Sequence, residues 1–165
     1  MHRPSQRVAV PGTAGAIECA IDEPPAAPVG VAVICHPHPQ HGGTMDNKVV
    51  QTLARAFVGL GWRAVRFNFR GVGESAGDWD HGRGEVDDAL AVTAAERDPN
   101  RAFALCGFSF GGYVAAAAAH RLREGRPPDT LVLVAPATSS FECPPASAAR
   151  HVAPGKAIRP TRAHV

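Results

Sequence analysis

Lysine, tyrosine and long apolar runs are scarce in this sequence. Lys48 and Lys156 are the only lysines, there is one tyrosine, and the formal net charge is +2. So small a charge provides no basic surface, and we expect neither nucleic acid nor a membrane as a partner. No apolar stretch is long enough to cross a bilayer, and the N-terminus lacks the apolar segment of a signal peptide. We therefore expect a cytoplasmic protein.

Paired cysteine spacings are also absent, which argues against a cysteine-based zinc site. Cys35 and Cys106 lie in apolar runs, and we expect both to be small buried side chains. The histidines of "HPHPQHGG" alternate with prolines, which disfavours the geometry of a three-histidine metal site. We expect the side chains of His36 and His41 to hydrogen-bond only locally. The sequence predicts no metal and no cofactor.

Hydrophobic residues make up 45% of the 165 residues and charged residues 19%, as in a globular protein of one domain. Apolar runs bounded by turn residues alternate with segments of helical period, and this order predicts an α/β fold with a mainly parallel sheet. The expected strands are 7–10, 16–22, 29–37, 62–69, 102–108 and 130–137. The expected helices are about 44–60, 85–97 and 110–122.

One short motif points to chemistry. "GFSFG", residues 107–111, matches G-x-S-x-G and lies between an expected strand and an expected helix. In that context a sharp turn lifts the serine hydroxyl above the sheet, and glycines two residues before and after it relieve the crowding. An ordinary glycine-rich turn is the structural alternative. A phosphate-binding loop is excluded because no Gly-Lys-Ser/Thr follows.

Three motifs together resemble the α/β-hydrolase superfamily, especially its short bacterial members of the dienelactone-hydrolase and serine-esterase kind. They are HPHP-x-x-GGTM-x-NK, RFNFRGVG-x-S-x-G and GFSFGG, and the resemblance covers about residues 6–142. It implies that Ser109 is a nucleophile toward a small-molecule acyl substrate. It also implies that the backbone N–H groups of His38 and Phe110 form an oxyanion hole, to which Pro37 has no N–H to contribute.

The glycine-rich loop "GVGESAG" superficially suggests a dinucleotide-binding fingerprint. Its spacing is not G-x-G-x-x-G, and Asp78, Trp79 and Asp80 follow instead of an apolar helix start. In the hydrolase interpretation this loop lies near the mouth of the site. Trp79 then lines that mouth, or it covers the edge of the core.

The last third of the chain departs from the superfamily pattern, in which an acid and then a histidine follow the serine. His120 lies too far along its helix, Asp129 lies at the wrong edge of the sheet, and Glu142 and His164 are weak substitutes. We therefore interpret residues 1–142 as a hydrolase core of about six strands that lacks the last two. Residues 143–165 form an irregular tail, and the sequence suggests a truncated or frameshifted member.

Three hypotheses about activity remain open at this point. The chain is a serine hydrolase acting on an ester or related acyl bond, or a catalytically incompetent relative, or an enzyme whose missing residues come from another chain. Without two further strands, "LVLVA" at 131–135 becomes an exposed apolar edge. We expect it to pair in a homodimer, to reduce solubility, or to be covered by the tail.

Overall fold

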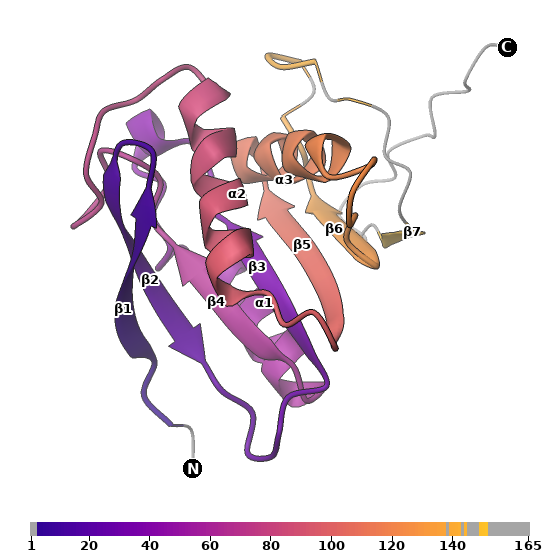
Figure 1. Ribbon diagram of the computed structural model, residues 1–165. Coiled ribbons are helices and arrows are strands. Elements are labelled where there is room, and N and C mark those ends of the chain that lie inside the picture. The colour runs from indigo at the N-terminus through magenta and orange to yellow at the C-terminus, as the bar shows by residue number, and fades with distance from the viewer. Residues whose placement is uncertain (1–2, 138, 143, 145–148, 152–165) are drawn as a thin grey trace, which may run out of the picture.

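The computed structural model describes residues 3–137, 139–142, 144 and 149–151. In this part of the chain the strands form one sheet, in the order β1-β2-β4-β3-β5-β6-β7 (Figure 1). The strands are β1 (Gln6–Gly12), β2 (Gly15–Asp22), β3 (Gly30–Cys35), β4 (Arg63–Phe67), β5 (Ala102–Phe108), β6 (Thr130–Val134) and β7 (Ala149–His151). The helices are α1 (Lys48–Gly59), α2 (Arg83–Glu96) and α3 (Phe110–Arg121), with a 3-10 turn, η1 (Pro39–His41).

The sheet is mainly parallel, as the sequence predicts. β1 and β2 form an antiparallel hairpin, and β2 pairs antiparallel with β4. The pairs β3–β4, β3–β5, β5–β6 and β6–β7 are all parallel. All six expected strands are present, so the fold class is confirmed.

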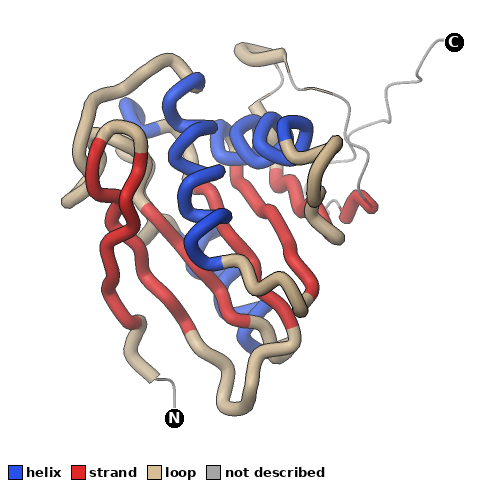
Figure 2. Tube along the Cα trace, viewed as in Figure 1, coloured by secondary structure: helices blue, strands red, loops and turns tan. Residues whose placement is uncertain are grey.

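Helices cover both faces of this sheet (Figures 1 and 2). α2 and α3 lie on one face, and α1 lies on the other. Each face therefore has its own apolar cluster, one containing Val33 and Phe67 and the other containing Ile34 and Val50. Every residue of β3 is buried, which is the pattern of a strand covered on both faces. Cys35 and Cys106 are buried free thiols, as expected.

Helix boundaries differ from the sequence prediction by a few residues. α1 begins at Lys48 rather than near residue 44, because the Asn47 side chain accepts the backbone N–H groups at the helix start. Leu60, the last residue of the helix expected at about 44–60, lies just after α1 and is 71% exposed. Gly61 follows it with φ +84°, and this left-handed conformation ends the helix before Leu60 can turn inward.

The edge beyond β6 carries a strand that the sequence prediction missed. β7 lies in the segment predicted to have little secondary structure, and it pairs with Thr130–Val132 of β6. The sequence prediction allowed a dimer, low solubility or coverage by the tail at this apolar edge. The structure shows that the tail covers Thr130–Val132 of β6. The other residues from 152 onward lie outside the described part of the chain.

The parallel strands bring four chain segments to one place. β3, β4, β5 and β6 all end at the same edge of the sheet, so the loops that follow them are neighbours. These loops contain the HPHPQHGG, RGVGESAG and GFSFG motifs. No helix in the part that the structure describes is both long and apolar enough to cross a membrane.

Candidate active site

Ser109 occupies a strained turn between β5 and α3. Its φ of +55° and ψ of −118° lie outside the regions that non-glycine residues favour, which costs on the order of 1–3 kcal/mol. Main-chain hydrogen bonds hold it there: its N–H donates to the Val134 carbonyl at 2.9 Å. Its carbonyl accepts the N–H groups of Gly112 at 2.9 Å and Ala137 at 3.1 Å. The turn is therefore fastened to both α3 and the segment after β6.

Two glycines allow this turn to close. A Cβ on Gly107 would lie 2.0 Å from the Gly111 carbonyl oxygen, so the positions two before and two after the serine are in contact. A Cβ on Gly111 would lie 2.2 Å from the Cys35 carbonyl oxygen and 2.5 Å from that of His36. The approach of Gly107 to Gly111 is as the sequence predicts, and the first turn of α3 also packs directly against the end of β3.

The loop after β3 is equally tight. The carbonyl of His38 accepts the N–H groups of His41 at 3.1 Å and Gly43 at 3.0 Å. A Cβ on Gly43 would lie 2.1 Å from the Pro37 carbonyl oxygen, so no side chain fits there. Nδ1 of His38 accepts the Gln40 N–H at 3.2 Å, which leaves the proton on Nε2. Burial, and to a lesser extent His41, lower the pKa of His38, and Glu85 opposes them.

His36 joins this loop to the loop after β4. Its ring is fully buried, with Nδ1 at 2.7 Å from the Pro37 carbonyl and Nε2 at 3.1 Å from the Phe69 N–H. Burial lowers the pKa of His36 to about 4, although the bond to Pro37 opposes that effect. The neutral ring donates from Nδ1 and accepts at Nε2. The expectation of purely local hydrogen bonding is thus wrong for His36, because Phe69 is 33 residues away.

The serine hydroxyl and the two N–H groups expected to form the site have no hydrogen-bond partner among the residues that the structure describes. Within the described residues, neither the His38 N–H nor the Phe110 N–H donates a hydrogen bond. The hydroxyl of Ser109 likewise has no hydrogen-bond partner there. Both N–H groups belong to segments that meet where Gly111 contacts the end of β3.

Aromatic rings surround His38 beside the turn. Its ring centroid lies 4.3 Å from that of His41, 4.7 Å from Trp79 and 5.2 Å from Phe110. Phe141, in the segment after β6, lies 5.3 Å from Phe110. The sequence left open whether Trp79 lines this mouth or covers the edge of the core, and it gave no signal for Phe141, which lies in a stretch without periodicity.

Comparison with known proteins fits this geometry. A family model described as serine aminopeptidase, S33, matches residues 26–158, which is more than half of the chain. A solved α/β serine hydrolase without a lid, from Xanthomonas campestris, is 40% identical, and the match covers 92% of this chain and 71% of that one with a TM-score of 0.79. The chain belongs to this family of α/β serine hydrolases.

Two further proteins are similar to this chain, and the first of them supports the assignment. An α/β serine hydrolase homologue from Coxiella burnetii is 36% identical, with coverage of 92% of this chain and 74% of that one and a TM-score of 0.77. An uncharacterised protein from Rickettsia prowazekii is 44% identical over 94 residues, which are 55% of this chain and 39% of that protein. The match thus spans about two fifths of the Rickettsia protein.

Among the side chains that the structure describes, no candidate acid or base hydrogen-bonds to Ser109. Asp129 accepts the Phe103 N–H at the start of β5, which is the opposite edge of the sheet, as expected. Glu142 is exposed. His151 belongs to β7, where its backbone pairs with Val132. His164 lies outside the described residues.

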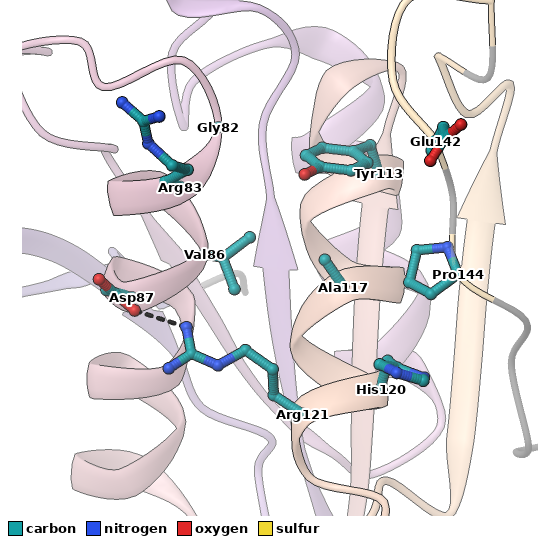
Figure 3. A pocket seen from close by; sticks show the side chains of 10 residues that line it. All are labelled: Gly82, Arg83, Val86, Asp87, Tyr113, Ala117, His120, Arg121, Glu142 and Pro144. Atoms are coloured by element: carbon teal, nitrogen blue, oxygen red, sulfur yellow. Dashed lines mark hydrogen bonds and ion pairs between the residues drawn. The ribbon is translucent and has the colours of Figure 1, made fainter.

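A cavity of about 840 Å³ lies between α2, α3 and the segment after β6 (Figure 3). Neither Ser109 nor His38 lines it, so this cavity is not the space beside the strained turn. The Arg121–Asp87 ion pair, at 2.6 Å, connects α3 to α2 across it. It is lined by Gly82, Arg83, Val86, Asp87, Tyr113, Ala117, His120, Arg121, Glu142 and Pro144.

Proposed function

We propose that the protein is a serine hydrolase that cleaves an ester or related acyl bond of a small molecule. One observation carries the proposal: the chain holds Ser109 at φ +55° with its hydroxyl unpartnered among the described residues. Such strain persists only where surrounding contacts enforce it, and it is common at active sites. The family assignment supports the same chemistry.

The proposed reaction begins when the Ser109 oxygen attacks the substrate's carbonyl carbon. The carbonyl π electrons move to its oxygen, and the N–H groups of His38 and Phe110 stabilise that negative charge. Each such donor contributes about 3–4 kcal/mol of transition-state stabilisation. The intermediate then expels the alcohol or amine, and water hydrolyses the acyl-enzyme to release the acid and restore the serine.

These reaction steps require a base that takes the serine proton and gives it to the leaving group. No histidine or carboxylate in the described part of the chain bonds to the Ser109 hydroxyl. The second candidate is a catalytically incompetent relative that keeps the turn and lacks turnover. Main-chain contacts hold the turn, so both candidates would have it. Only turnover distinguishes them.

Two measurements on one set of variants test the proposal. A fluorophosphonate probe reports attack by the serine, and p-nitrophenyl acetate hydrolysis reports turnover. Ser109→Ala should abolish both, whereas Ser140→Ala, an exposed serine in the segment after β6, should change neither. Labelling without turnover would support the incompetent relative. A folded sample with neither activity would overturn the hydrolase proposal.

A further inference from the structure

Glu85 is a fully buried carboxylate in the first turn of α2, close to the proposed site. Its Oε1 accepts the Asp80 N–H at 2.8 Å, and its Oε2 accepts the Gly82 N–H at 2.8 Å. No arginine, lysine or histidine pairs with it among the described residues. A buried carboxylate is tolerated only when its oxygens are hydrogen-bonded. These two main-chain bonds therefore account for its presence there.

The loop that Glu85 holds has an unfavourable backbone. His81 has φ +55° and Gly82 has φ +91°, so two consecutive residues are left-handed. A histidine pays a steric cost in this region that a glycine does not. Asp80 also caps the helix, since its carboxylate accepts the Gly84 N–H at 3.0 Å. Glu85 binds one N–H on each side of His81, and the Asp80 carbonyl accepts the Arg83 N–H at 3.1 Å.

Trp79 directly precedes the loop and contacts both proposed oxyanion residues. Its ring centroid lies 4.7 Å from His38 and 5.2 Å from Phe110. Phe110 is fully buried, whereas Trp79 is half-buried. Trp79 therefore offers the accessible apolar surface of this group of three rings. Its position depends on the conformation of residues 80–82.

We propose that Glu85 is a positioning residue, whose buried carboxylate fixes the 80–82 loop and so holds Trp79 against His38 and Phe110 as a wall of the substrate site. The substrate part of this statement rests on the proposed function. The positioning part does not, because it concerns only the folded chain. Glutamine in place of Glu85 supplies one acceptor oxygen and sets its NH₂ group against the other backbone N–H.

The test uses Trp79 as its own reporter. The chain has two tryptophans, so Trp62→Phe leaves Trp79 as the only one. In that background Glu85→Gln should raise acrylamide quenching of Trp79 at least about twofold and shift its emission to the red, because the loop opens locally. Asp87→Asn makes the same chemical change on the same helix at a 38% exposed carboxylate, and it should leave Trp79 unchanged.

Two further measurements keep the proposal falsifiable. Val50→Ala, a buried residue of the α1 face, should lower the melting temperature without raising Trp79 quenching. Equal quenching in Val50→Ala and Glu85→Gln would overturn the proposal, as would unchanged quenching in Glu85→Gln. If Glu85→Gln does not fold, wild-type amide exchange decides. Asp80 and Gly82 should exchange at least about tenfold more slowly than His81, and equal rates would refute the idea.

Turnover separates this inference from the proposed function. If the chain hydrolyses p-nitrophenyl esters, Glu85→Gln should raise KM more than it lowers kcat, because Trp79 contacts the substrate rather than the reacting bond. A fall in kcat with KM unchanged would contradict the proposal that Trp79 forms a wall of the substrate site. If the wild type hydrolyses nothing, the proposed function fails. The fluorescence and exchange results then still decide whether Glu85 positions Trp79.

Discussion

The buried His36 should make the stability of this fold depend on pH in a defined window. Phenylalanine in its place keeps a ring but removes both hydrogen bonds, so the Phe69 N–H and the Pro37 carbonyl lose their partner. A buried unpaired N–H costs about 1–3 kcal/mol. Wild type should therefore be more stable than His36→Phe by about that amount at neutral pH, where His36 is uncharged.

Acid should remove that advantage. The pKa of His36 falls from 6.5 in the unfolded chain to about 4 in the fold. Between these values the unfolded state binds more protons than the folded state, so stability falls as pH falls. At about 1.4 kcal/mol per pKa unit, the full loss is about 3 kcal/mol. It is complete near the folded pKa and absent above the unfolded one.

Urea unfolding followed by circular dichroism measures this effect at about pH 7 and about pH 4.5. The free energies of wild type and His36→Phe are compared at each pH, because carboxylates common to both cancel in the difference. The difference should shrink by about 2–3 kcal/mol in acid. His36→Gln is the matched control: its oxygen can accept the Phe69 N–H, but it does not titrate. A wild-type advantage that is equal at both pH values would refute the buried, neutral histidine.

Three more substitutions test the packing around the site. Gly107→Ala should lower the free energy of unfolding in urea by at least about 3 kcal/mol, since its Cβ would meet a backbone oxygen at 2.0 Å. Gly59→Ala, with open space around it, should be neutral or slightly stabilising. Equal effects of the two substitutions would contradict the close approach at Gly107. Arg66→Met leaves the buried Asp22 carboxylate without its arginine partner and should lower the free energy of unfolding by about 3–5 kcal/mol. A loss below about 1 kcal/mol would show that the ion pair is dispensable. Proline at Arg150, in the middle of β7, should free the β6 edge and increase self-association in sedimentation velocity, and an unchanged monomer fraction would argue against that role.

Much of the fold was predictable because its signals are local. The six residues of β3 are uniformly apolar and all buried, and the GFSFG turn places its glycines in contact, as the motif requires. The start of α1 was predicted less well. Asn47 caps that helix and Asn68, from the loop after β4, binds the Met45 N–H, so a distant residue contributes to the boundary.

The support of the site was not predictable from sequence. Glu85 looks like any acidic residue in a first helical turn, and only the fold shows that both its oxygens bind the preceding loop. His36 was expected to bond locally, yet its Nε2 accepts an N–H from another strand's loop. Phe141 joins the rings around Phe110 from a segment with no periodicity. The contacts of His36 and Phe141 join residues about thirty positions apart, which no local pattern relates.

The geometry of Ser109 does not by itself decide between the two candidate functions, because a turn held by Val134 and Ala137 forms whether or not a base is present. Added imidazole separates them. A general base contributes about 10²–10⁴-fold, so a serine without one should be labelled by the phosphonate slowly, and imidazole at tens of millimolar should accelerate labelling by about tenfold or more. A serine served by its own base should not respond. The proposed hydrolase predicts no response, and Ser109→Ala should stay unlabelled in both conditions. Strong rescue would instead identify a chain that presents a nucleophile without the group that activates it.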